Sequence, residues 1–367
     1  MKIIESNIIY DNPLPQLRSR QSMFPFLCQL EDKSIAAVHV IGEAFESVDL
    51  TSYISFSRDK GKTWSEPKRL FDKENLQCPV SDCCKPVCLK DGRIVVMGYA
   101  YYRQNPKFPL GNAGTGGLLD DFVFYSVSED NGITWNGMNE IPCSWGSHAE
   151  ASAPITVLQD GTWITPITGF PNWEGNMTGP MCGRMLRSED EGKTWNDDAI
   201  CMQFDGRQVT CYEQRVCQLE SGAIICIGWN EDVETGERLA NHYTVSYDNG
   251  KSWSQPISTG IMGQAPSVCA IGGERFLALH AIRRDTERPG IYGYVVDFSN
   301  REWEIVDELL VWEPATPIIK DNKQVEIFSF LKFGQPGAIL LDDGEVMMSH
   351  WFAEPGQYKT VATRIKI

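Results

Sequence analysis

The sequence lacks long apolar runs and internal breaks. No stretch approaches the ~18 consecutive apolar residues of a membrane-spanning helix. The first residues, 1–6 (MKIIES), have neither the apolar core nor the small-residue cleavage site of a secretory signal. No low-complexity tract, charge block or linker divides the chain. We therefore expect no membrane partner, a cytoplasmic location and one domain over residues 1–367.

Histidine and positive charge are also scarce. The chain has 5 histidines, and its 12 cysteines form no C-x-x-C pair of the kind that binds zinc. With 33 lysines and arginines against 49 aspartates and glutamates, the formal net charge is −16, which opposes binding to nucleic acid or to an anionic membrane. We therefore predict reduced thiols, no metal, no other cofactor and no nucleic-acid partner.

Four copies of the pattern S-x-D-x-G-x-[ST]-W, here called boxes, recur along the chain. They begin at Ser57, Ser128, Ser188 and Ser246, which are 71, 60 and 58 residues apart. Serine and aspartate side chains can bind the amides of a turn, glycine can adopt a positive φ, and tryptophan can fill the space between neighbouring sheets. One aspartate per box supplies too few oxygen ligands for calcium. We interpret each box as a β-hairpin turn, and the recurrence as typical of a propeller or solenoid.

A second repeat lies out of phase with the boxes. Each copy is a short stretch, often with proline, followed by an apolar run, a tight turn and another apolar run. The six copies start at Phe24-Pro25, Lys85-Pro86, Ala153-Pro154, Gln214-Arg215, Ala265-Pro266 and Gln335-Pro336. Divided among six units, 367 residues give about 61 per unit, which matches the box spacing. The sequence thus predicts an all-β, six-bladed β-propeller of four-stranded antiparallel blades, whose last blade is closed by an N-terminal strand over residues 2–10.

The alternation of strands sorts the loops between two rims. The boxes and the turns after each first strand share one rim, and the starts of the first strands share the other with the loops between second and third strands. The second rim carries longer loops with more charged and aromatic residues. Because function commonly lies on loops held by a rigid scaffold, we expect the site at that second rim.

Six units with these boxes resemble the sialidase (neuraminidase) superfamily, and the resemblance covers the whole chain. It implies a glycoside hydrolase. The family's catalytic glutamate lies at the start of a fourth-blade strand, a place that Tyr212-Glu213-Gln214-Arg215 matches. The family's acid/base aspartate lies in the loop before the first box, where Asp49 is found. The resemblance therefore implies Asp49 and Glu213 as the catalytic pair.

The chain departs from the family at other positions. The family's first substrate-binding arginine is replaced in Met23-Phe24-Pro25, and its second by Trp229-Asn230. The third arginine corresponds to Arg283 or Arg284, and the nucleophilic tyrosine position holds Gln335. Without that tyrosine, a direct attack by water is open, with Glu213 as general base and Asp49 as general acid.

The first hypothesis is a sialidase-like hydrolase of a small, acidic glycoside. Glycoside cleavage needs two carboxyl groups beside one bond, here Asp49 and Glu213. Arg215, Arg283 and Arg284 can offer planar guanidinium groups to a substrate carboxylate. We expect the other substrate-binding residues to be Tyr212, Trp229, His148, Glu150 and Gln335.

Two alternatives stay open. A uronate lyase would use imidazole and carboxylate groups as bases, and His148-Ala-Glu150 offers both, with three further histidines near the same rim, His242, His280 and His350. A non-catalytic glycan-binding propeller would instead stack sugars on tryptophans, for which the candidates are Trp145, Trp173, Trp229 and Trp351.

Overall fold

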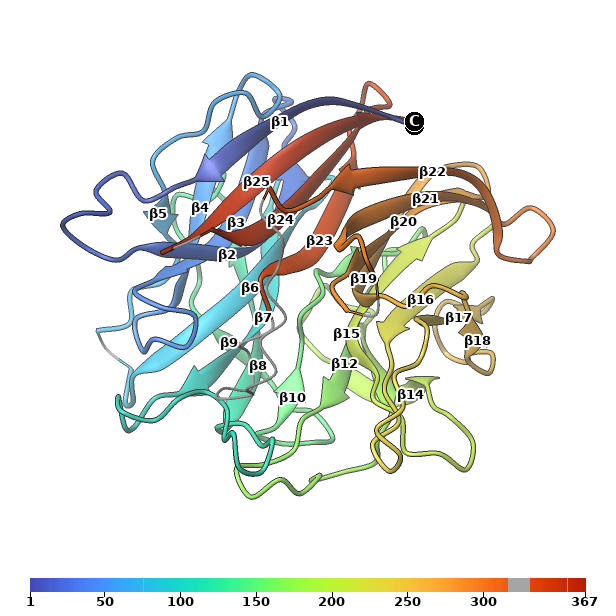
Figure 1. The fold of residues 1–367 in the computed structure, drawn as a ribbon, viewed down its shortest axis with the longest axis horizontal. Helices are drawn as coiled ribbons and strands as arrows, with labels where there is room; N and C mark the ends of the chain where they lie inside the picture. The colour runs from blue at the N-terminus through green and yellow to red at the C-terminus, as the bar shows by residue number, and fades with distance from the viewer. Residues whose placement is uncertain (75, 285, 316–330, 355) are drawn as a thin grey trace.

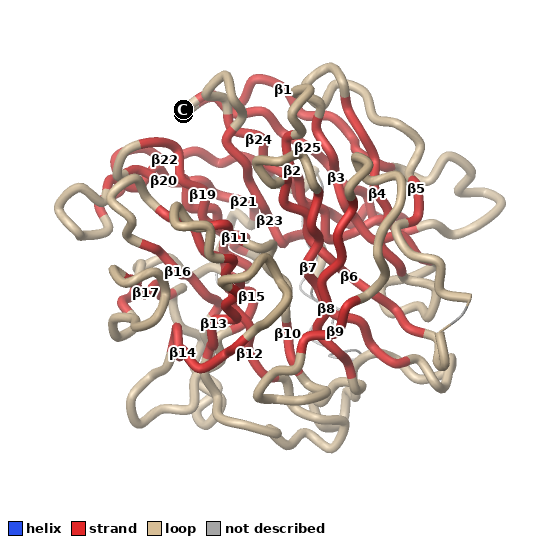
Figure 2. Tube along the Cα trace, turned by 180° about the vertical axis from the view of Figure 1, so that it is seen from behind, coloured by secondary structure: helices blue, strands red, loops and turns tan. Residues whose placement is uncertain are grey.

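The strands form a ring of six antiparallel sheets. The computed structural model describes residues 1–74, 76–284, 286–315, 331–354 and 356–367, and within these ranges it contains 25 strands and no helix. Figure 1 shows the sheets following one another around the ring in chain order. Figure 2, the view from behind, shows that loops and turns make every connection drawn. The described part of the chain therefore holds no helix that could cross a membrane.

Each sheet is one blade, and its strands follow the chain from the axis outward. The first three blades are β2 (Gln21–Gln29), β3 (Ile35–Gly42), β4 (Thr51–Ser57) and β5 (Lys68–Arg69); β6 (Val80–Cys88), β7 (Ile94–Tyr102), β8 (Asp121–Ser128) and β9 (Asn139–Ile141); and β10 (Ala149–Glu150), β11 (Thr156–Val157), β12 (Trp163–Gly169), β13 (Gly183–Ser188) and β14 (Asn196–Met202). In the third blade the innermost strand is divided into β10 and β11, which both pair with β12.

The remaining blades complete the ring. They are β15 (Tyr212–Gln218), β16 (Ile224–Trp229), β17 (His242–Ser246) and β18 (Ile257–Ser258); β19 (Gln264–Gly272), β20 (Arg275–Ile282), β21 (Gly290–Asp297) and β22 (Glu304–Trp312); and β23 (Phe333–Leu340), β24 (Val346–Glu354), β25 (Gln357–Lys366) and β1 (Lys2–Tyr10). The N-terminal strand β1 pairs antiparallel with β25, from Lys2 opposite Lys366 to Tyr10 opposite Thr360. The predicted six-bladed fold and its closure are both confirmed.

The boxes form the hairpin turns that the sequence predicts. In the third box, Ser188 Oγ accepts the amide of Gly192 at 2.8 Å, and Asp190 Oδ1 accepts the amide of Thr194 at 2.8 Å. The other aspartate oxygen accepts the Thr194 hydroxyl at 2.7 Å. Equivalent bonds recur in the other three boxes. Each box therefore satisfies its turn amides with its own side chains.

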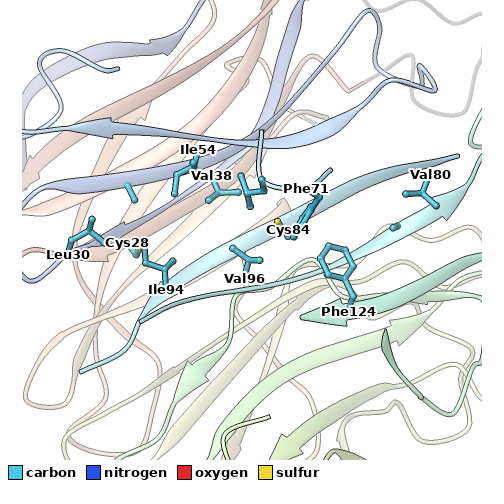
Figure 3. Close-up of a cluster of buried hydrophobic side chains, with 13 residues drawn as sticks. Cys28, Leu30, Val38, Ile54, Phe71, Val80, Cys84, Ile94, Val96 and Phe124 are labelled. Atoms are coloured by element: carbon cyan, nitrogen blue, oxygen red, sulfur yellow. The ribbon is translucent and has the colours of Figure 1, made fainter. Parts of the chain in front are cut away.

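Apolar side chains fill the space between adjacent blades. Figure 3 shows the cluster between the first two blades, where Val38 and Ile54 of β3 and β4 face Val96 of β7 and Cys84 of β6. The box tryptophans extend such clusters, and Trp195 packs against Trp163 with ring centroids 6.4 Å apart. Because each cluster joins two blades, the core is a ring of wedges around an axial hollow of about 850 Å³.

Four innermost strands share a β-bulge near their first residues. Their ladders shift register at this point. In each bulge one residue adopts a positive φ: 53° at Phe24, 49° at Glu213, 46° at Ala265 and 41° at Gln335. Such bulges redirect a side chain from the sheet toward a site. They lie on the rim opposite the boxes, because boxes contact the turns at the far end of these strands, as in the ion pair between Lys60 and Asp343.

Candidate active site

A cavity of about 250 Å³ lies at the rim where the bulged strands begin. Its described lining contains three carboxylates, Asp82, Glu150 and Glu213, and the amide of Gln335. Aromatic rings form most of the remaining wall: Phe24, Phe45, Tyr99, Tyr101, Phe170, Tyr212 and Trp229. These groups come from the first four blades and the sixth. The cavity is therefore largely aromatic, with a small set of polar groups that converge within it.

Two of the three acidic residues are in contact across neighbouring blades. Glu150 ends the short strand β10 and is 4% exposed, whereas Glu213 is the second residue of β15. The backbone amide of Glu213 donates to both carboxylate oxygens of Glu150, at 3.1 Å each. Burial, reinforced by the negative charge of Glu213, raises the pKa of Glu150 to about 7. Glu150 is thus a carboxylic acid that can donate a proton near neutral pH.

Gln335 fixes the second carboxylate of the pair. Its Nε2 donates to Glu213 Oε1 at 2.5 Å, although the two residues are 122 positions apart in the chain. Both residues occupy the positive-φ position of their bulges. Corresponding places in blades four and six therefore direct the two side chains toward each other.

The third lining carboxylate is held by the protein itself. Asp82 accepts bonds from the Thr51 hydroxyl at 2.8 Å and the Ser52 amide at 3.0 Å, and it forms an ion pair with Lys73. With its oxygens so occupied, Asp82 joins the first two blades and has little capacity left for a ligand.

The structure places the three predicted arginines around the cavity, outside its described lining. Arg215 Nη1 donates to Ser152 Oγ at 3.1 Å and to the Gln214 carbonyl at 2.7 Å. Arg283 Nε donates to the Phe333 carbonyl at 2.6 Å, and burial lowers the pKa of Arg283 to about 10. Arg284 forms an ion pair with Glu231 and lies 5.6 Å over the ring of Trp229.

The structure does not bring Asp49 together with Glu213. Asp49 Oδ1 accepts the Glu43 amide at 3.0 Å and the Ser47 hydroxyl at 2.6 Å, so this carboxylate closes its own loop. It lies beside a separate hollow that Arg69 and Lys73 also line. Within the described residues, the carboxylate that contacts Glu213 is Glu150, through the Glu213 amide. The sequence suggested Glu150 for substrate binding and, in the lyase alternative, as a base.

Two of the predicted binding residues lie in the aromatic wall. The ring of Tyr212 is 5.6 Å from Phe170 and 6.2 Å from Trp229, between centroids. His148 lies outside the described lining, with its Nε2 3.4 Å from Asp120 Oδ1. The phenols of Tyr99 and Tyr101 were not among the predicted binding residues. Their spacing of two along an apolar strand could have indicated that both rings face the same side, because such residues share one face of a sheet.

The other histidines are dispersed. His242 Nδ1 contacts the Ala240 carbonyl at 2.8 Å, and His280 Nδ1 contacts Asn241 at 2.7 Å. Burial lowers the pKa of His280 and of His350 to about 3, which keeps both neutral. No group of three metal-ligating side chains occurs within the described ranges. These placements leave the cavity lining without a histidine base among the described residues.

The candidate tryptophans differ in their surroundings. Trp145 and Trp351 are buried in packing between elements, at 2% and 0% exposure. Trp173 stacks on the half-exposed ring of Phe108 with centroids 5.7 Å apart. Of the four tryptophans considered for sugar stacking, only Trp229 is part of the described cavity wall.

Two loops of the cavity wall are joined by Arg103. This side chain is 1% exposed, and its Nη2 donates to the carbonyls of Glu46 at 2.9 Å and Phe108 at 3.0 Å. The Glu46 carboxylate in turn accepts the amide of Leu110 at 2.6 Å. The loop over residues 43–50 and the loop over residues 103–118, which both contribute lining residues, are therefore held as one unit.

Comparison with known proteins shows a shared fold. No protein-family model matches the chain, and no curated protein sequence does. A protein of unknown function from Dyadobacter fermentans aligns over 100% of this chain and 99% of its own, with a TM-score of 0.77 and 18% identity. The intramolecular trans-sialidase from Ruminococcus gnavus aligns over 99% and 97%, with a TM-score of 0.62 and 11% identity.

A Hadza microbial sialidase is also similar. It aligns over 94% of this chain and 65% of its own, with a TM-score of 0.65 and 16% identity. This chain therefore spans about two thirds of that sialidase. At these identities the likeness shows the fold alone, and the fold is that of the sialidase-like propellers.

Proposed function

We propose that this chain is a glycoside hydrolase that acts on a small glycoside, with Glu150 as general acid and Glu213 as the second carboxylate. One observation carries the proposal: a buried acid with a pKa of about 7 accepts the backbone amide of a second glutamate, and both glutamates line an aromatic cavity. Two carboxyl groups in different environments are the requirement for glycoside cleavage.

The dimensions of the cavity support a small substrate. A volume of about 250 Å³ is slightly below the ~300 Å³ at which small-molecule pockets usually begin. One sugar ring against Tyr212 and Trp229 fits this size better than a polymer does. The likeness to sialidase structures supports the same class of reaction. The twelve free cysteines support a reducing compartment, which we propose to be the cytoplasm.

In the proposed reaction, the proton of Glu150 moves to the glycosidic oxygen as the bond between that oxygen and the anomeric carbon breaks. Glu213, oriented by Gln335, stabilises the positive charge that develops on the sugar. Water then supplies a hydroxyl group to the anomeric carbon, and its remaining proton restores the carboxyl pair. The configuration of the released sugar, measured by NMR, distinguishes attack by Glu213 itself from direct attack by water.

The test is hydrolysis of a panel of aryl glycosides by the wild type and by two isosteric variants. We expect Glu150→Gln and Glu213→Gln each to lower kcat by about 10²-fold or more, with the melting temperature close to that of the wild type. Glu234→Gln is the control, because it removes the same charge from an exposed loop of the same rim. Full turnover in either site variant would refute the assignment. Sugar binding without turnover by the wild type would identify a glycan-binding propeller instead.

A further inference from the structure

Two acceptor atoms on the cavity wall have no donor. Glu213 Oε2 and Gln335 Oε1 are both buried without a hydrogen-bond partner, although each residue lines the cavity. The assignment of the Gln335 amide follows from chemistry: an ionised carboxylate only accepts, so the amide must present Nε2 to Glu213 and direct its oxygen elsewhere. Buried acceptors without donors are costly, which indicates that a ligand supplies the missing donors.

The charge of the wall points to a cationic donor. Its described members include three carboxylates and no lysine or arginine. Among the described residues, Arg215 and Arg283 interact electrostatically with Glu213 from behind the wall, without a direct ion pair. The nearby cations are engaged with the protein: Lys85 Nζ donates to the Phe24 carbonyl at 2.5 Å, and Arg215 donates to Ser152 and Gln214. A ligand in the cavity thus meets carboxylate and amide oxygens first.

We propose that the sugar bound in this cavity carries a protonated amino group, so that the substrate class is an amino-sugar glycoside. The inference names the substrate of the site proposed above and rests on that function. One ammonium group carries three donors, enough for Glu213 Oε2 and Gln335 Oε1 together. Its charge is opposite to that of the Glu213 carboxylate, and the face of Tyr212 favours a cation.

The competing sugars fit less well. A neutral hydroxyl group carries one hydrogen, so it can donate to Glu213 Oε2 or to Gln335 Oε1 but not to both. A sugar carboxylate supplies neither a donor nor the right charge, and it would face Glu150 and Glu213 at short range. Arg215 Nε and Arg283 Nη1 have no hydrogen-bond partner, but neither residue is part of the described lining, so an acidic substrate would need one of these side chains to move into the cavity.

The test measures binding, so that its outcome is independent of turnover. Methyl glycosides are compared in matched sets of three that differ in one substituent: an amine, a hydroxyl group or a carboxylate. The sets cover the gluco, galacto and manno configurations in both anomers. At about pH 6, where such an amine is protonated, we expect calorimetry to show the amine of at least one set binding about tenfold more tightly than its hydroxyl partner.

Variants separate recognition of the amine from general effects. Glu213→Gln should remove the tenfold preference for the amine, and Glu234→Gln should keep it. The inference would be overturned if the wild type bound no amine more tightly than the matched hydroxyl and carboxylate glycosides. This result does not depend on whether the variants fold. If amine binding is found while no aryl glycoside is cleaved, the ligand class stands and the hydrolase proposal fails.

Discussion

The backbone amide of Glu213 lies 3.1 Å from both carboxylate oxygens of Glu150, so the start of one blade fixes the acid of the blade before it. The carboxyl group is buried and close to a second negative charge. Both effects favour its protonated form, and its pKa rises to about 7 from the ordinary 4.5.

Activity should follow the protonation of this group. We expect kcat/KM to be highest where Glu150 keeps its proton and to fall about tenfold per pH unit once the pH exceeds about 7. The decline is measured by recording kcat/KM against pH with the aryl glycoside that is cleaved fastest. A rate that stays constant from pH 6 to about pH 9 would show that Glu150 is not the acid.

Stability should respond to pH with a sign fixed by the same shift. Because the folded pKa lies above the unfolded one, the contribution of Glu150 is complete below about pH 4.5 and is lost as pH rises through about 7. The full effect is on the order of 3 kcal/mol. Glu150→Gln cannot ionise, so its unfolding free energy should fall less than that of the wild type between these pH values. Parallel denaturant titrations of both proteins measure the difference, and identical pH dependences would contradict it.

Removal of a box aspartate should affect the fold and spare the site. Asp190→Ala deletes the acceptor of two bonds from Thr194, so we expect a lower melting temperature. Those bonds lower the pKa of Asp190 to about 2, and their contribution is lost as pH falls toward that value. The difference in unfolding free energy between the wild type and the variant should therefore become smaller in acid. Turnover per folded molecule should equal that of the wild type, because the boxes lie on the opposite rim.

The exposed Asp198 of the same blade provides the control for the box variant. Asp198→Ala should leave the melting temperature nearly unchanged. A loss of kcat in Asp190→Ala at unchanged stability would assign the boxes to the active rim.

Arg103 should matter for substrate binding although it touches no substrate. In Arg103→Lys a short ammonium group replaces a planar one that reaches the carbonyls of Glu46 and Phe108. We expect a loss of about 2 kcal/mol in unfolding free energy and a raised KM with a smaller change in kcat, since the two loops separate at the cavity wall. Arg93→Lys, on the opposite rim, should change neither KM nor kcat. Equal KM values for the Arg103 variant and the wild type would show that the loops hold their places without Arg103.

The fold could be predicted because its signals are local and repeated. Each box contains the side chains that bind its own turn amides, so four copies at a regular spacing identified both the turn and the blade. The closure by β1 could also be predicted, because the sixth unit of the sequence contains three strands and the blade needs a fourth. Turns of this kind can be predicted without knowing which other parts of the chain pack against them.

The site was less predictable because it depends on contacts between blades. Glu213 lies in the cavity wall, as its place at the start of a strand suggested. The proton affinity of Glu150 arises from burial between blades three and four, which no residue spacing reveals. Asp49 had the expected position in the chain, but the two bonds that close its own loop turn it away from the cavity.

The pairing of β1 with β25 has a consequence for biosynthesis. About 350 residues separate β1 from β25, so β25 leaves the ribosome roughly 20–70 s after β1 at ~5–20 residues per second. During that interval five blades can assemble while β1 has no neighbour in its sheet. The strand carries Glu5, Ser6 and Asn7 at its centre, and polar residues of this kind discourage an unpaired edge from joining another chain. The nascent propeller thus carries its own protection against aggregation until the ring can close.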